Sequence, residues 1–146
     1  MRILIVKKDQ NTAQALRNKL FETAEKLYPD SKVAFCCSQA SAMEYLRKYE
    51  FDAIVSGDHL KDRGTGQDIY NAIRSRDGYK KTPIVIYSPD PDAKARVRQL
   101  NTQVPPDPFV YHVSANEHGE TEIFQCLRRG LNLPATRART PALAST

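Results

Sequence analysis

Polar residues with chemically useful side chains follow or end short apolar runs at four places along the chain. They are Lys7, Lys8 and Asp9; Asp58, which follows Gly57; Ser88; and His112. Carboxylate oxygens ligate hard cations such as Mg²⁺, whereas hydroxyl groups and cations contact anionic groups. If the fold brings these places together, they form one polar pocket whose chemistry depends on the balance of carboxylates and cations.

Five short apolar runs precede or contain these residues and read as strands buried on both faces. They extend from Ile3 to Val6, from Val33 to Cys36 or Cys37, from Ala53 to Val55 or Ser56, from Ile84 to Tyr87, and from Phe109 to Val113. Their alternation with amphipathic stretches predicts an α/β fold with a flavodoxin-like parallel sheet in the order 2-1-3-4-5 and helices on both faces. Sites in such sheets form at the carboxyl ends of the strands, where the polar residues lie.

Apolar residues at steps of three or four predict a helix after each strand. The first carries Ala13 to Leu27, the second runs from Ser38 or Ala40 to Tyr49, the third is marked by Ile69 and Ile73 and closed by Asp77-Gly78, the fourth runs from Asp92 to Leu100, and the last from Glu120 to Leu131. We therefore expect one domain over residues 1–133. Residues 134–146 have no periodicity and are predicted to be a flexible tail or linker.

The composition excludes several classes of protein. The opening apolar run is too short for a secretory signal or a membrane span, so we expect a cytoplasmic protein. Three cysteines, Cys36, Cys37 and Cys126, form neither a disulfide framework nor a metal-binding pattern and are read as core residues. A net charge of +5 permits an acidic partner, but no nucleic-acid-binding motif accompanies it, so nucleic-acid binding by this domain alone is not expected.

Four segments carry a resemblance to a known family: MRILIVKKD, FDAIVSGDHLKDRGTG, TPIVIYSP and FVYHVS. In this order they resemble the first, third, fourth and fifth strands, with their loops, of the receiver domains of response regulators in two-component signalling. The resemblance extends to about Leu133. It implies a Mg²⁺-binding acidic pair after the first strand, a phosphoacceptor aspartate after the third, a Ser or Thr after the fourth, and an aromatic residue followed by a lysine in the fifth.

The first departure from that pattern concerns the metal. The family's acidic pair falls on Lys7 and Lys8, and only Asp9 beside them is a carboxylate. Two ammonium groups repel a divalent cation, and one carboxylate leaves a Mg²⁺ site short of charge. We therefore expect no metal cofactor, with Mg²⁺ binding weak or absent, and much of the electrostatic help for phosphoryl transfer would be lost.

The position of the acceptor depends on the direction of counting. Counting forward from Phe51-Asp52 places it on Gly57, which has no side chain. Counting back from Gly64-Thr65-Gly66 places it on Asp58, which requires one extra residue in the third strand, and a glycine at position 57 suits a bulge. Asp58 is thus the candidate phosphoacceptor, or else a carboxylate paired with Lys7 or Lys8. The ion pair is the preferred hypothesis.

Three further positions complete the degenerate pocket that the resemblance implies. Ser88 matches the family's hydroxyl, although a serine after a strand is also an ordinary turn residue. His112 replaces the lysine, and an imidazole is a poorer fixed cation near neutral pH. Phe109 takes the place of the aromatic switch residue, and its alternative role is plain core.

These departures favour a pseudo-receiver that is not an enzyme and that acts by phosphorylation-independent binding to a protein partner. The last helices and strand are its predicted surface, where Arg96, Arg98, Arg128 and Arg129 suit an acidic partner. A homodimer through the same helices and strand is an alternative. An active but unusual receiver phosphorylated at Asp58 is the alternative. A flavodoxin-like binder of a small ligand or nucleic acid is a third, although the Lys-Lys-Asp-Gln-Asn loop lacks the glycines and hydroxyls that cradle phosphates.

Overall fold

The computed structural model describes residues 1–116 and 119–133 and contains one five-stranded parallel sheet in the order β2-β1-β3-β4-β5. The strands are β1 (Arg2–Val6), β2 (Lys32–Cys36), β3 (Ala53–Ser56), β4 (Ile84–Tyr87) and β5 (Val110–Val113). The helices are α1 (Gln10–Leu27), α2 (Gln39–Lys48), α3 (Gly66–Arg74), α4 (Pro91–Thr102) and α5 (Gly119–Gly130). Both the fold class and the strand order predicted from the sequence are confirmed. The predicted tail, residues 134–146, lies outside the described residues.

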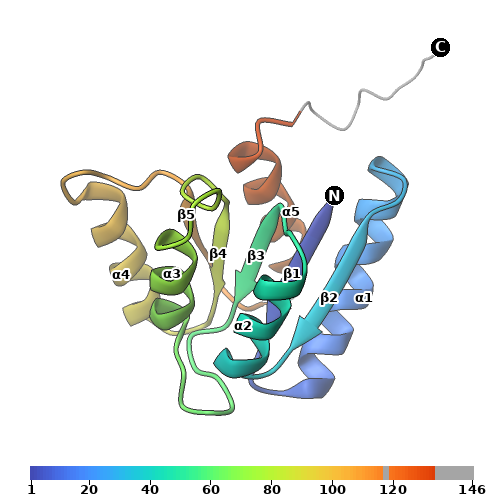
Figure 1. Cartoon of the computed structure of the whole chain (residues 1–146), viewed down its shortest axis with the longest axis horizontal. Helices are drawn as coiled ribbons and strands as arrows, with labels where there is room; N and C mark the ends of the chain where they lie inside the picture. Colours follow the sequence, from blue (N-terminus) through green and yellow to red (C-terminus); the bar gives the residue numbers. More distant parts are fainter. Residues whose placement is uncertain (117–118, 134–146) are drawn as a thin grey trace.

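Helices cover both faces of the sheet (Figure 1). Buried residues of α2, α3 and α4 pack with Val6, Ile54 and Ile86 on one face. Buried residues of α1 and α5 pack with Ile5 and Val55 on the other. Because successive side chains of a strand point to opposite faces, each strand supplies both cores, which explains why its sequence is apolar without alternation.

Polar side chains cap the helices that surround the carboxyl ends of the strands. Asp9 caps α1, Ser38 caps α2 as one of the two predicted starts, and Asp90 caps α4. Thr65 and Asp68 form a reciprocal capping box at the start of α3. These caps tie the loops after the strands to the helices that follow, and so fix the rim of the candidate site.

Strand β5 begins one residue later than predicted. The N–H of Phe109 donates to Asp107 Oδ1 at 2.9 Å, so it does not enter the strand ladder, although its carbonyl accepts from Ile84 N. Phe109 therefore lies at the amino end of β5 and is only partly buried. The cysteines are all free; Cys36 is buried, whereas Cys37 and Cys126 are partly buried.

A partly buried polar hub joins α3 to the amino ends of β4 and β5. Arg74 Nε lies 2.7 Å from Asp107 Oδ2, which also accepts from the Tyr70 hydroxyl at 2.6 Å. The Arg74 guanidinium also donates to the carbonyls of Tyr79, Thr82 and Phe109. Burial, and then the contact with the Asp107 carboxylate, raises the pKa of Tyr70 to about 12. Burial would raise the pKa of Asp107, but these hydrogen bonds outweigh it and hold that pKa below the ordinary value of 3.8.

Within the described residues, no helix is long and apolar enough to cross a membrane.

Candidate functional site

Lys7 occupies the position at the carboxyl end of β1 that the sequence assigned to a degenerate metal site. Its Nζ donates to the carbonyl of Tyr87 at 3.4 Å and lies 4.9 Å from the centre of the Tyr87 ring. Burial lowers the pKa of this ammonium group from its ordinary value of 10.5. The cation is therefore fixed between β1 and β4, and is not a solvated residue at a strand end.

Gly57 lies directly beside this ammonium group. A Cβ atom at position 57 would be 3.6 Å from Lys7 Nζ and 3.3 Å from Lys7 Cδ. The N–H of Gly57 donates to Val6 O at 2.8 Å, which continues the pairing of Val6 with Ser56. The pairing thus reaches Gly57 without the extra residue that a bulge would insert. By strand register, Gly57 therefore occupies the position directly after β3, to which the forward count assigned the acceptor. The Lys7 side chain fills the space beside it.

Asp58 points away from Lys7, and this corrects the predicted ion pair. Its Oδ1 accepts a hydrogen bond from Arg96 Nη2 on α4, and its Oδ2 lies 3.6 Å from His59 Nε2. Among the described residues no ion pair joins Asp58 to Lys7 or Lys8. The reason is that successive positions along a strand face opposite sides of the sheet. Position 57 faces the α1/α5 side, as Lys7 does. The Asp58 side chain therefore lies on the α3/α4 side.

The surroundings of Asp58 leave little room for another group. The side chain is only 5% exposed, whereas that of Arg96 is 41% exposed. The cavity beneath the pair, lined by α3, α4 and β5, has a volume of about 10 Å³, which is about enough for one water molecule. Arg96 therefore supplies the countercharge of Asp58, and α4 closes over the carboxylate.

Asp9 and Lys8 lie outside this arrangement. Both are exposed. Asp9 Oδ2 accepts hydrogen bonds from the hydroxyl and the N–H of Thr12, at 2.7 and 2.8 Å, and these bonds lower the pKa of Asp9. The one carboxylate predicted near the lysines is thus engaged as a helix cap.

Ser88 and His112 meet at the carboxyl ends of β4 and β5, as their positions predicted. His112 Nε2 lies 3.0 Å from the carbonyl oxygen of Ser88. The buried Ser88 hydroxyl accepts from the N–H of Asp90 at 3.1 Å. Both side chains thus hold the loop between β4 and α4. Phe109, the candidate switch residue, is not brought to this edge because it lies at the opposite end of β5.

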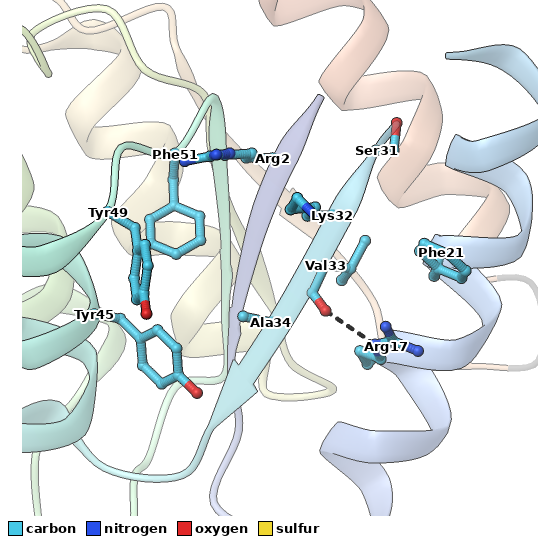
Figure 2. Close-up of a pocket in the computed structure, with 10 residues that line it drawn as sticks. All are labelled: Arg2, Arg17, Phe21, Ser31, Lys32, Val33, Ala34, Tyr45, Tyr49 and Phe51. Atoms are coloured by element: carbon cyan, nitrogen blue, oxygen red, sulfur yellow. Dashed lines mark hydrogen bonds between the residues drawn. The ribbon is translucent and has the colours of Figure 1, made fainter. Parts of the chain in front are cut away.

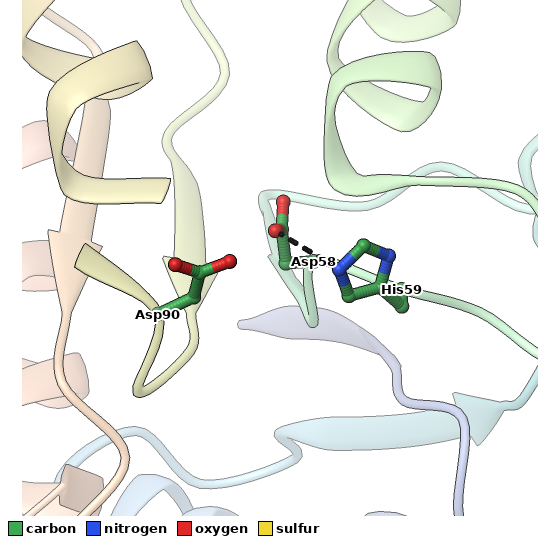
Figure 3. A group of neighbouring side chains, drawn as sticks. All are labelled: Asp58, His59 and Asp90. Carbon is green, nitrogen blue, oxygen red and sulfur yellow. Dashed lines mark ion pairs between the residues drawn. The ribbon is translucent and has the colours of Figure 1, made fainter. Parts of the chain in front are cut away.

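A Mg²⁺ ion of the kind that the family resemblance implies does not fit these residues. Lys7 occupies the β1 side, Asp9 caps a helix, and Asp58 is bound by Arg96. A different group, Asp58, His59 and Asp90, brings its potential ligand atoms within 4.8 Å of one another (Figure 3). Asp90 Oδ1 accepts from Asp92 N there, and an imidazole suits transition metals better than Mg²⁺. The arrangement can hold charges in place, but it offers no open carboxylate cluster for Mg²⁺.

Sequence reasoning missed two residues that organise this rim. Arg96 was assigned to a partner surface, whereas it contacts Asp58 across 38 positions of sequence. Asp62 accepts from the N–H groups of Gln39 and Ala40, both at 3.0 Å, and so anchors the loop after β3 to the start of α2. These bonds lower the pKa of Asp62. A carboxylate in a loop favours contact with the amino end of a helix, but the neighbouring sequence does not indicate which helix that is.

Comparison with known proteins places the fold among receiver domains. No family profile and no curated protein matches the chain. A sensor protein of a Polaromonas species has a similar structure, with 21% identity, a TM-score of 0.69, and coverage of 90% of this chain and 95% of that chain. The receiver domain of a Pseudomonas aeruginosa sensor histidine kinase, which holds magnesium in its active-site cleft, shows 16% identity and a TM-score of 0.65, covering 90% of this chain and 97% of that one.

A chemotaxis response regulator of Vibrio cholerae is similar to the same degree. It shows 18% identity and a TM-score of 0.65, and the match covers 88% of this chain and 97% of that chain. At these identities the comparisons bear on architecture alone. The chain therefore has the receiver-type, flavodoxin-like fold over nearly the whole length of those domains.

Proposed function

We propose that this chain is a receiver-like signalling domain that works by binding a protein partner without being phosphorylated. The observation that carries the proposal is the pair of fixed cations at the carboxyl edge of the sheet. Lys7 stands beside Gly57, and Arg96 is bound to Asp58. Lys7 and Arg96 therefore lie where phosphoryl transfer would require a bound divalent cation and a free carboxylate. The domain is then a non-enzymatic binding module of the cytoplasm.

The surface formed by α4, β5 and α5 is the proposed contact. Arg98 and Arg129 are exposed there and Arg128 is partly exposed, so the surface suits an acidic partner. A homodimer through the same elements is the alternative. Arg96 is removed from the predicted set because it is engaged with Asp58. The link between Arg96 and Asp58 also holds α4 against the sheet, which presents this surface in one fixed arrangement.

One observation favours the alternative of an active receiver. Asp58 is buried at the edge of the sheet beside a guanidinium group, and a positioned Arg stabilises the charge of a transferring phosphoryl group. On that hypothesis Arg96 would take over part of the role of the metal. The two functions differ in whether Asp58 accepts a phosphoryl group.

We expect no phosphorylation when the purified domain is incubated with a small-molecule phosphodonor and Mg²⁺. The reason is that Asp58 is already paired with Arg96, and that Asp90, the neighbouring carboxylate, is engaged as the cap of α4. Intact-mass spectrometry measures the result, with an ordinary receiver domain treated in parallel to verify the donor. A mass gain of one phosphoryl group that disappears in Asp58→Asn, and persists in the matched control Asp77→Asn at an exposed turn position, would establish the active alternative instead.

A further inference from the structure

The outer edge of β2 is open, and β1 separates β2 from β3, the strand that leads to Asp58. In the described sheet β2 pairs with β1 alone. Lys32 N–H donates to Met1 O, and Cys36 O accepts from Lys7 N, both on the β1 side. Because peptide groups along a strand alternate in direction, those of Val33 and Phe35 face away from β1. They are the groups to which another strand would bond.

Side chains from both faces wall this edge (Figure 2). On the α2 side stand Tyr45, Tyr49 and Phe51, with the Tyr45 ring centre 6.1 Å from that of Tyr49 and 6.4 Å from that of Phe51. On the α1 side, the Arg17 guanidinium lies 4.6 Å from the Phe21 ring centre. The cavity that they share has a volume of about 640 Å³. The edge therefore lies in a groove with an aromatic wall on one side.

The charge of this groove has one sign. Its lining includes Arg2, Arg17 and Lys32 and no Asp or Glu. None of these three basic side chains forms an ion pair with another described residue, and Arg2 and Lys32 are exposed. Arg17 Nε donates to the carbonyl of Val33 at 2.9 Å and so covers one edge acceptor. An incoming backbone can take over that contact while a carboxylate engages the released guanidinium.

We propose that the edge of β2 binds an extended acidic segment of a partner protein by strand addition. The segment's backbone would bond to Val33 and Phe35, its carboxylates would meet Arg17 and Lys32, and an apolar side chain would pack against the tyrosines. Aromatic and basic residues also suit single-stranded nucleic acid, but a row of outward peptide groups matches another polypeptide backbone. The inference is independent of the Asp58 pocket and of the α4-β5-α5 surface.

The experiment uses three fluorescent probes with the full chain: a six-residue peptide of alternating Glu and Val, its Lys-Val counterpart, and oligothymidylate. Fluorescence anisotropy measures binding, and amide hydrogen exchange by NMR locates it. The acidic peptide is expected to bind at least about tenfold more tightly than the basic peptide and to protect the amides of Val33 and Phe35. The double variant Arg17→Glu with Lys32→Glu is expected to lose at least about tenfold in affinity.

The matched control, Lys26→Glu with Lys81→Glu, makes the same change in net charge at exposed positions outside the groove lining and is expected to leave the affinity unchanged. If the double variant at the groove does not fold, Lys32→Ala at an exposed position provides the comparison. The inference fails if millimolar acidic peptide does not bind, if binding leaves the amides of Val33 and Phe35 unprotected, or if oligothymidylate binds more tightly than the peptide.

Discussion

Replacing Arg74 with Ala is expected to lower the free energy of unfolding by about 3 kcal/mol, the low end of the cost of removing one partner of a buried ion pair. The side chains of Arg74 and Asp107 are each only 12% exposed. The substitution leaves the Asp107 carboxylate without its cation and removes a donor from the carbonyl oxygens of Tyr79, Thr82 and Phe109, of which Phe109 keeps its bond from Ile84 N. Urea unfolding followed by circular dichroism measures the change.

Arg47→Ala provides the matched control. Arg47 pairs with Glu44 on the exposed face of α2, so its loss is expected to cost no more than about 0.5 kcal/mol. Arg74→Lys is expected to recover only part of the stability, because an ammonium group cannot reproduce the planar fork of donors. If Arg74→Ala costs no more than the Arg47 control, the hub does not hold the two strands to α3.

The second large effect concerns the contact that closes the candidate site. Arg96→Ala is expected to destabilise the domain by about 2 kcal/mol, because it leaves Asp58 charged and 5% exposed. Asp58→Asn removes that unpaired charge, so adding it to Arg96→Ala should restore part of the loss. A double-mutant cycle by urea unfolding measures the coupling, which we expect at about 1.5–3 kcal/mol.

The control for this cycle is Arg98→Ala, two residues along α4 and exposed. It is expected to change stability by less than about 0.5 kcal/mol. Additive effects of Arg96→Ala and Asp58→Asn would contradict the account, because they would show that the two side chains do not interact in solution.

The fold was largely predictable because its signals are local. Runs of three to five apolar residues without alternation are typical of parallel strands that are buried on both faces of a sheet, and β4 was located to the residue. The predicted range of helix α4 was too short at both ends, because the helix has few apolar residues to mark its limits. At the amino end, Asp90 and Pro91 start the helix before its first buried residue, Ala93. The late start of β5 depended on Asp107, whose side chain captures the N–H of Phe109.

The candidate site was only partly predictable. Its location followed from the predicted carboxyl ends of the strands. Its excess of cations followed from Lys7, which stands where the family resemblance implies a carboxylate. The side on which Asp58 emerges was also within reach, because Val55 and Gly57 must share one face and Asp58 the other. The partner of Asp58 was not, since Arg96 is distant in sequence and belongs to a helix that also carries Lys94 and Arg98. Only the packing of α4 selects Arg96 among them.

The central claim is that Lys7 and Arg96 occupy the pocket around Asp58 with fixed positive charges. The most direct test of this claim is an NMR titration of the backbone amides with Mg²⁺, alone and then with beryllofluoride as a phosphoryl mimic. We predict no saturable shift at Gly57, Asp58 or His59 at millimolar Mg²⁺, because Lys7 and Arg96 already hold the positions that a cation would need. Saturable Mg²⁺-dependent shifts at these amides that grow with beryllofluoride and vanish in Asp58→Asn would contradict the account.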